Sequence, residues 1–348
     1  MSRTDAVVVG AGVMGAAAAW RLARAGRDVV LLEQFEVGHD RGSSHGAARV
    51  FRVSYDESRY VAMALEALPL WRRLEEESGQ AILTMTGGFD LGPPARLEAH
   101  QEALDAWGAV WDLVDGEEVR RRFPGVAPPP DAKVLFQPDA GVLAADRALR
   151  AMVDVATARG VELRERTHVS ALRPGREGVE VVTKKDTLEA KVVVVTAGAW
   201  ARPLLAGAGI DLPVTPSRET VAFFPVEAGI DLPVLVEYVE DLRPLYALPS
   251  PGQGLKTGWH HSGSDADPDR PGTVESRIVQ RMSAWVAERF PAARPLPHHA
   301  ETCLYANTAD ESFILERRGP VVIGSACSGH GFKFAPLIGE RLARLASG

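Results

Sequence analysis

The stretch Ala6-Val-Val-Val-Gly10-Ala-Gly12-Val-Met-Gly15 decides how this chain begins to fold. Its β-branched residues predict a short buried strand, and residues 14–25 have the composition of a helix. Between them, the first glycine permits a tight turn, the second lets the backbone approach a pyrophosphate, and the third allows close helix packing. A GxGxxG spacing in this context predicts a site for an adenine dinucleotide.

A second apolar run, Val29-Val-Leu-Leu32, follows the helix and is succeeded by Glu33. The strand, helix and second strand form a unit with the short connections of a parallel sheet. An acidic side chain at Glu33 can accept hydrogen bonds from ribose hydroxyls and would repel a 2′-phosphate, so NADP is disfavoured. The fingerprint alone does not distinguish NAD from FAD.

Composition excludes several classes of protein. The chain has 348 residues, a net charge of −7 and 46% hydrophobic residues, which is typical of a folded globular protein and not of a nucleic-acid-binding one. Two cysteines cannot form a disulfide framework, so a cytoplasmic location is expected, although one disulfide between them stays open. The most apolar stretch, residues 6–20, contains three glycines and is too short to span a bilayer, so neither a membrane helix nor a signal peptide is expected.

The later segments predict two interleaved domains. Helices are expected near residues 59–77, 146–159 and 335–345, with strands at 84–92, 192–195 and 321–324. The Pro- and Gly-rich region 212–297 has the short apolar runs of a mixed or antiparallel sheet. The expected fold class is α/β: a Rossmann-like dinucleotide-binding domain from residues 1–84, 140–205 and 304–348, with a discontinuous α+β substrate domain from 85–139 and 206–303.

Five further motifs occur in a specific order. They are Gly42-Ser-Ser-His45-Gly-Ala-Ala-Arg49-Val-Phe-Arg52, Thr196-Ala-Gly198-Ala-Trp200, Gly254-Leu-Lys256-Thr-Gly-Trp-His260, Glu301-Thr-Cys303-Leu-Tyr-Ala-Asn-Thr308 and Ser328-Gly-His330-Gly-Phe-Lys333-Phe. With these motifs, the chain resembles the FAD-dependent amine oxidases of the monomeric sarcosine oxidase and N-methyltryptophan oxidase type, within the D-amino acid oxidase superfamily. The resemblance implies FAD as the cofactor.

The resemblance implies a set of cofactor contacts. The cysteine in the position of Cys303 carries the flavin through a thioether, although a buried cysteine can also be simple packing, the reading adopted for Cys327. The residue in the position of Val169 lays its backbone against the adenine. The expected cofactor-binding residues are Gly10, Gly12, Gly15, Glu33, His45, Arg49, Val169, Gly198, Trp200, Cys303, Gly329, His330, Gly331 and Lys333.

The same resemblance assigns substrate and redox roles. Arg52 and Lys333 match the cations that hold a substrate carboxylate, which suits their chemistry. Lys256 matches the oxygen-activating lysine, and Arg49 adds fixed positive charge near the flavin. Tyr246 and His260 match residues that line the substrate pocket. The expected catalytic set is therefore Lys256, Arg49, His260 and Tyr246, with ordinary solvated cations and half-buried strand residues as the competing interpretation.

The chain departs from the family pattern before Arg49. Ala47 and Ala48 replace a polar pair that the resemblance implies between His45-Gly and Arg49, which removes hydrogen bonds near the cofactor. The pairs His260-His261 and His298-His299 could suggest metal binding, but neighbouring side chains on a strand point to opposite faces. No metal site is expected.

The resulting prediction is a monomeric flavin-dependent oxidase of a secondary amino acid. Sarcosine or another N-methyl amino acid would be oxidised to an imine, which hydrolyses to an amine and an aldehyde, while O2 is reduced to H2O2. Alternatives are an oxidase of a cyclic imino acid such as proline or pipecolate, or of a larger N-methyl amino acid, and a dehydrogenase that passes electrons to a carrier. A nucleotide-binding module without turnover is a more distant alternative. Neither nucleic acid nor a membrane is an expected partner.

Overall fold

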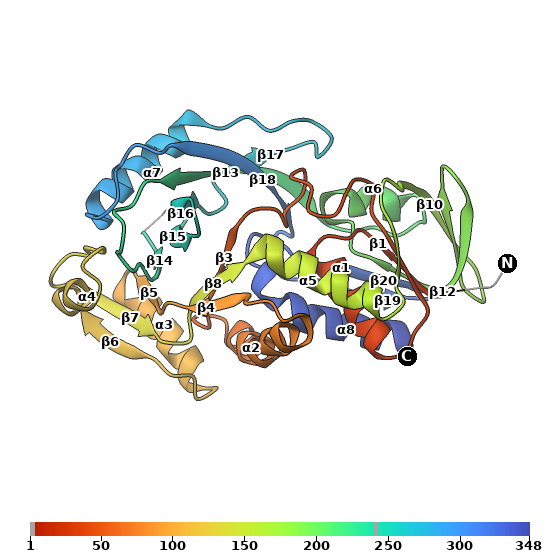
Figure 1. Cartoon of the computed structure of the whole chain (residues 1–348), viewed down its shortest axis with the longest axis horizontal. Coiled ribbons are helices and arrows are strands. Elements are labelled where there is room, and N and C mark those ends of the chain that lie inside the picture. The colour runs from red at the N-terminus through yellow and green to blue at the C-terminus, as the bar shows by residue number, and fades with distance from the viewer. Residues whose placement is uncertain (1–3, 240–242) are drawn as a thin grey trace.

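The computed structural model describes residues 4–239 and 243–348. An eight-stranded sheet forms one half of the molecule in space (Figure 1). Five of its strands are parallel to one another. Strand β19 pairs antiparallel with β20. The β10–β11 hairpin pairs antiparallel with the first half of β12 through β11. The parallel strands, in spatial order, are β20 (Val321–Ser325), β12 (Thr187–Val195), β1 (Thr4–Val9), β2 (Val29–Leu32) and β9 (Glu162–Arg164). The added strands are β19 (Ile314–Arg318), β10 (Val169–Pro174) and β11 (Val179–Thr183).

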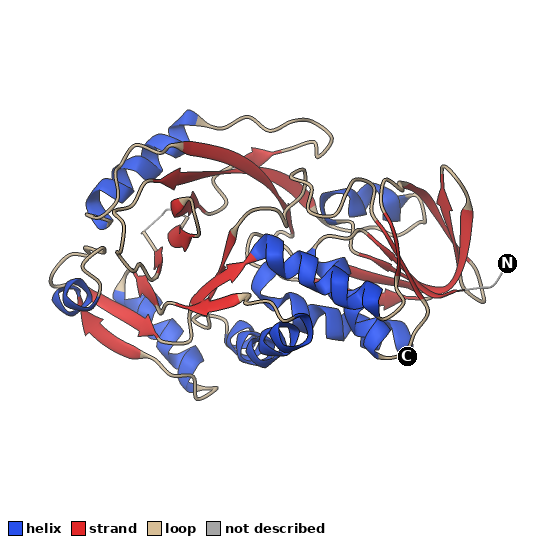
Figure 2. Ribbon diagram, viewed as in Figure 1, coloured by secondary structure: helices blue, strands red, loops and turns tan. Residues whose placement is uncertain are grey.

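This sheet is buried on both faces, as a parallel sheet of β-branched residues requires. Ala6 and Val8 of β1 face one hydrophobic core, while Val7 and Val9 face the other. Figure 2 shows a layer of helices along the first face. This layer consists of α1 (Val13–Arg24), α2 (Ser58–Ser78), α5 (Ala145–Ala158) and α8 (Ala335–Ser347), while α6 (Ala201–Ala206) packs with β10 on the second face.

The second half of the molecule is built on a nine-stranded sheet. Helix α7 (Ser276–Arg289) covers it through Ile278, Met282 and Trp285, which join the third hydrophobic core. Helices α3 (Pro94–Asp105) and α4 (Gly116–Arg122) belong to the same half (Figure 1). The strands are β5 (Gly88–Leu91), β6 (Asp112–Asp115), β7 (Lys133–Gln137), β13 (Thr215–Phe224), β14 (Val234–Glu237), β15 (Leu245–Ser250), β16 (Gly254–Trp259), β17 (Ser264–Asp265) and β18 (His299–Asn307).

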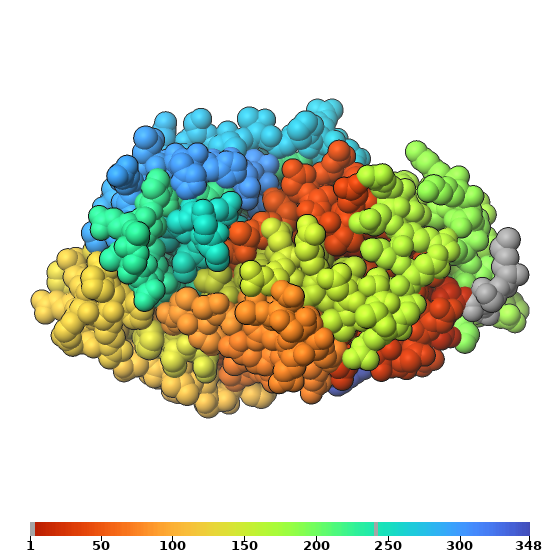
Figure 3. Space-filling model, viewed as in Figure 1, coloured from red at the N-terminus to blue at the C-terminus, as the bar shows by residue number. Residues whose placement is uncertain are grey.

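A small third sheet contains β3 (Ala48–Phe51), β8 (Gly141–Ala144) and β4 (Leu83–Met85), and its β3 and β8 contact β15 of the large sheet. Short 3-10 turns at Gly198–Trp200 and Phe332–Phe334 precede α6 and α8. The space-filling view shows that segments distant in sequence share each end of the molecule (Figure 3). The expected α/β class, with a Rossmann-like sheet and a second domain on a mixed sheet, is confirmed.

Two expected boundaries differ from the structure. The single strand expected at residues 84–92 is two strands in different sheets, because Gly87, with φ of +69°, breaks the chain between β4 and β5. The expected domain border at residue 303 falls inside β18, which pairs with β13 along its whole length. Residues 1–3 and 240–242 of the expected domains lie outside the described residues.

Within residues 4–239 and 243–348, no helix combines the length and the apolar character that crossing a membrane would need.

Candidate active site

The fingerprint loop joins β1 to α1 in the manner its glycines predict. Gly10 has a φ of +97°, a left-handed conformation that favours glycine. A Cβ on Gly15 would lie 1.8 Å from the carbonyl oxygen of Gly10, so α1 can pack against the loop only because no side chain intervenes. Gly12 is the N-cap of α1, and the backbone N–H of Val13 donates to Ser44 Oγ at 3.0 Å.

We expect Gly15→Ala to disrupt this packing and to lower the flavin content of the purified protein. Overpacking of a tight contact costs about 1–3 kcal/mol. The measurements are the thermal midpoint and the ratio of flavin to protein absorbance. Gly207→Ala is the matched control, because a Cβ there meets only ordinary contacts, the nearest at 3.5 Å. Unchanged stability and flavin content in Gly15→Ala would contradict the assigned packing role.

Glu33 follows β2 and is almost fully buried. Its carboxylate accepts hydrogen bonds from the backbone N–H groups of Ala11 and Phe35, both at 2.9 Å. The side chain therefore ties the fingerprint loop to the end of β2. It also lines the main cavity, where its oxygens could accept further hydrogen bonds from ribose hydroxyls.

A single cavity of about 530 Å³ connects the fingerprint loop to the second half of the molecule. Residues from all three sheets line it, and the predicted site residues converge there from segments that lie far apart in the sequence. The predicted residues that line it are Gly10, Gly12, Glu33, Arg49, Arg52, Val169, Gly198, Trp200, Tyr246, Lys256, His260, Cys303, Gly329, His330, Gly331 and Lys333.

The two remaining predicted residues, Gly15 and His45, do not line this cavity. Gly15 acts through the helix packing described above. A second cavity, of about 470 Å³, is lined by His45 and Glu301 among others. The His45 backbone carbonyl accepts a 2.6 Å hydrogen bond from Arg49, which lines the main cavity. His45 therefore contacts the main cavity's lining through Arg49.

Arg49 and Lys256 are two basic side chains that share a hydrogen-bond acceptor. The guanidinium of Arg49 donates to the carbonyl oxygens of Ser43, His45 and Ala48. Lys256, which is 4% exposed, donates to the same Ala48 carbonyl at 3.3 Å. Burial, followed by the charge of Arg49, lowers the pKa of Lys256 to about 7. The site thus concentrates positive charge where the polar pair replaced by Ala47-Ala48 was expected.

Cys303 lies on β18, buried and with a free thiol, and Cys327 is also free. Burial raises the pKa of the Cys303 thiol, while Arg49 and Lys256 act in the opposite direction and favour the thiolate. The two cations are therefore the groups that can activate this sulfur as a nucleophile.

Arg52 and Lys333 both contact Tyr55. The Arg52 guanidinium is 4.3 Å from the centre of the Tyr55 ring, and Lys333 Nζ donates to the Tyr55 hydroxyl and to the His330 carbonyl, both at 2.7 Å. Lys333 is 5% exposed, and burial together with the charge of Arg52 lowers its pKa. Across the described residues, no carboxylate forms an ion pair with Lys333.

Sequence reasoning missed the carboxylate that faces Arg52. Asp90 of β5 is fully buried, lies 3.5 Å from the Arg52 guanidinium and accepts a 2.6 Å hydrogen bond from Gln137. Burial raises the pKa of Asp90 to about 6, whereas Arg52 lowers it. Asp90 and Tyr55 lie in no quoted motif, although the closeness of Tyr55 to Arg52 in the sequence was a usable signal.

The side chains of Tyr246 and His260 each pack against a glycine, and a Cβ on that glycine would clash with them. A Cβ on Gly258 would lie 2.4 Å from the Tyr246 hydroxyl, and one on Gly329 would lie 2.5 Å from the His260 ring. Burial raises the pKa of Tyr246 and lowers that of His260 to about 4, so both side chains are neutral near pH 7.

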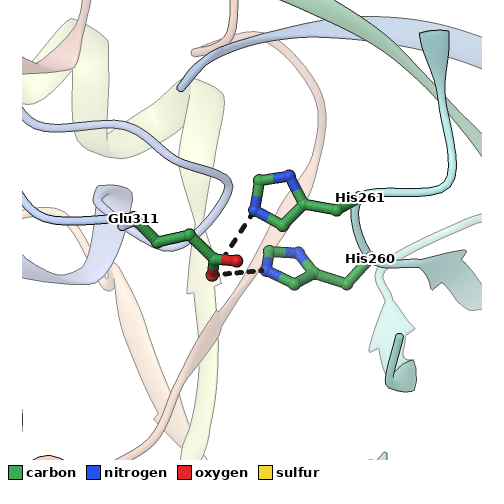
Figure 4. Close-up of side chains that lie close together, drawn as sticks. All are labelled: His260, His261 and Glu311. Carbon is green, nitrogen blue, oxygen red and sulfur yellow. Dashed lines mark ion pairs between the residues drawn. The ribbon is translucent and has the colours of Figure 1, made fainter. Parts of the chain in front are cut away.

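The sequence analysis expected no metal at the histidine pairs because it placed neighbouring histidines on opposite faces of a strand. This premise is wrong for His260 and His261, which lie beyond the end of a strand. Strand β16 ends at Trp259, and His261 has a φ of +50°, so the two residues do not alternate across a sheet. Both imidazoles turn towards Glu311 (Figure 4). Glu311 is a further residue that the sequence analysis missed, because it follows the last residue of its quoted motif.

The residues present fit an FAD. The glycine cradle, the acidic residue after β2 and the length of the cavity suit a dinucleotide, and Arg49 and Lys256 provide positive charge farther along it. The fold and the site together define a flavoprotein oxidoreductase.

Comparison with known proteins agrees. A model of the FAD dependent oxidoreductase family matches residues 5–345, and the chain belongs to this family. It is 35% identical to a monomeric sarcosine oxidase of Bacillus sp. (strain B-0618), covering 98% of this chain and 92% of that one. It is 28% identical to an N-methyl-L-tryptophan oxidase of Yersinia pestis, covering 98% and 94%. The open form of NikD, an amino acid oxidase essential for nikkomycin biosynthesis, superposes with a TM-score of 0.89 and 27% identity, covering 99% and 94%.

Proposed function

We propose that this enzyme oxidises the C–N bond of a secondary amino acid, with sarcosine or another N-methyl amino acid as substrate and O2 as the electron acceptor. The imine product hydrolyses to an amine and an aldehyde, and O2 becomes H2O2. FAD, when bound, supplies the two-electron oxidation. The relatives named for N-methyl amino acids support this choice of substrate.

The observation that carries the proposal is the pair of cations around Tyr55. Burying Arg52 and Lys333 together is costly unless an anion joins them, and Asp90 faces only Arg52. A substrate carboxylate would supply the missing negative charge, with Arg52 able to bind it in bidentate fashion. The neutral side chains of Tyr246 and His260 would then line the space for the amine.

Arg49 and Lys256 have the second proposed role. Their positive charges stabilise negative charge that develops at the cofactor and at oxygen during turnover. Arg49 is held by three backbone carbonyls, so its charge is placed before the reaction begins. We also propose that Cys303 bonds covalently to the flavin. The name of the sarcosine oxidase relative supports a monomer. The two free thiols support a cytoplasmic location.

The activity is tested by coupling peroxide formation to a peroxidase dye with sarcosine, larger N-methyl amino acids, proline and pipecolate. Peroxide with an N-methyl amino acid is the expected result. Faster turnover of proline or pipecolate would move the substrate to the cyclic imino acids. Flavin bleaching under anaerobic conditions without peroxide in air would indicate a dehydrogenase, and no bleaching with any amino acid would overturn the proposal.

The covalent link is tested with the acid-precipitated protein. We expect the yellow colour to stay in the pellet of the parent enzyme and to move entirely to the supernatant in Cys303→Ala, because the sulfur is the only proposed attachment point. Cys327→Ala is the matched control and should retain its colour in the pellet. Colour in the supernatant of the parent enzyme would contradict the attachment while leaving the flavoenzyme proposal intact.

A further inference from the structure

Two imidazoles and one carboxylate face each other next to the main cavity. His260 and His261 follow β16, and Glu311 lies in the loop between β18 and β19. Glu311 Oε2 is 3.8 Å from His260 Nε2 and 3.5 Å from His261 Nε2, and the three ligand atoms lie within 4.8 Å of one another (Figure 4).

These distances are longer than good hydrogen bonds, which join nitrogen and oxygen at about 2.7–3.2 Å. His261 Nε2 is buried, and among the residues that the structure describes it has no hydrogen-bond partner. Leaving a buried nitrogen without a partner destabilises the folded state. The cluster therefore presents polar atoms that converge without satisfying one another.

The separations suit a metal ion better than direct hydrogen bonds. Zn²⁺ binds histidine nitrogen and carboxylate oxygen at about 2.0–2.2 Å in tetrahedral geometry, which places donor atoms roughly 3.3 Å apart. Two histidines and one glutamate form a known class of zinc ligand set that leaves an open coordination position.

The backbone holds this arrangement in an uncommon conformation. His261 has a φ of +50° and Glu311 a φ of +61°, and both are non-glycine residues in the left-handed region. Such residues are strained and persist where the surrounding structure requires them. Here the left-handed residue after His260 lets the two rings approach to 4.2 Å between centroids on one side of the chain.

One neighbouring charge opposes a cation. Arg243 contacts Glu311 Oε1 at 2.7 Å, while Oε2 faces the imidazoles. The Arg243 side chain is 58% exposed, so solvent screens its charge. Oε2 therefore stays available as a ligand, and removing the arginine charge should tighten metal binding.

We propose that His260, His261 and Glu311 bind one divalent transition-metal ion of the zinc class, and that its binding inhibits the enzyme. His260 lines the main cavity, so a metal at its Nε2 changes the wall that faces the substrate. The inhibitory part rests on the proposed oxidase function, whereas metal binding by itself does not.

The test titrates the flavin-loaded enzyme with CoCl2 and follows the d–d absorption on the long-wavelength side of the flavin bands, then repeats the titration with ZnCl2 in the peroxide assay. We expect one Co²⁺ per chain, displacement by Zn²⁺, and a loss of kcat/KM of about tenfold or more that EDTA reverses. His261→Asn should weaken binding by at least about 10–100-fold and keep normal turnover, because asparagine accepts the left-handed backbone.

Two other variants make the result decisive. Glu311→Gln should also weaken binding, and Arg243→Gln should strengthen it. His299→Asn is the matched control, because His299 and Glu301 form a histidine–carboxylate pair at 3.3 Å without a third ligand.

Failure of Co²⁺ to bind, or binding that His261→Asn leaves unchanged, would overturn the metal site even if turnover is normal. Binding without inhibition would overturn only the regulatory part, and absence of turnover with every amino acid would instead concern the proposed function.

Discussion

Replacing Lys256 by Met should slow reoxidation of the flavin by O2 by about 10²–10³-fold, the usual cost of removing one preorganised charge from an active site. Anaerobic reduction by substrate should change far less, because the proposed carboxylate site is formed by other residues, Arg52 and Lys333. Stopped-flow absorbance measures both half-reactions. Lys191→Met is the control, since Lys191 is an exposed lysine paired with Asp5. Equal effects on the two half-reactions would refute the role assigned to Lys256.

The pH dependence of reoxidation gives a second check on the same residue. Burial lowers the pKa of Lys256 to about 7, and negative charge at the cofactor during turnover would raise it again. The activating form is the protonated one, so the rate constant should fall as pH rises through a value at or above about 7. Lys256→Arg, whose charge is permanent, should show a flat profile over this range. A rate that increases with pH in the parent enzyme would contradict this assignment.

The second large effect is expected for Lys333→Met. Removing one partner of a buried charge pair costs about 2–5 kcal/mol, so kcat/KM for an N-methyl amino acid should fall by roughly 30- to 4,000-fold. An N-methylamine without a carboxylate should be affected much less. Lys133→Met, at an exposed position, is the control. An equal loss for both kinds of amine would indicate damage to the fold or to the flavin site and not loss of carboxylate binding.

Carboxylate binding should also depend on pH in a defined direction. Burial and the charge of Arg52 lower the pKa of Lys333 in the free enzyme, and a bound carboxylate would raise it. Binding therefore takes up a proton wherever free Lys333 is neutral, and affinity should fall as pH rises. Titration of the flavin spectrum with acetate at several pH values measures this, and Lys333→Met should lose the dependence.

Much of the cofactor half of the site is predictable because its signals are local. The strand, the glycines and Glu33 occupy one short segment. The glycines are needed for the local backbone conformation and for close packing within that segment. The motifs around Arg49, Lys256, Cys303 and Lys333 likewise name residues that the structure brings into one cavity.

The surroundings of those residues are not predictable in this way. Asp90 reaches Arg52 from another sheet, and Tyr55 bridges Arg52 to Lys333 only because α8 is preceded by a turn that packs beside it. These contacts join residues far apart in sequence, and they depend on strand register and on packing between sheets. The pKa of each cation follows from the same burial and cannot be read from its neighbours in the chain.

The sequence by itself determined the dinucleotide-binding unit, the choice of FAD by resemblance and the identity of most charged residues in the site, because periodicity, glycine spacing and motif order are properties of short segments. Only the tertiary structure decided that His45 lines a second cavity and not the main one, and that His260 and His261 both face Glu311. The physical reason is that the end of β16 and the left-handed φ of His261 depend on how the loops pack, which local alternation of side chains does not specify.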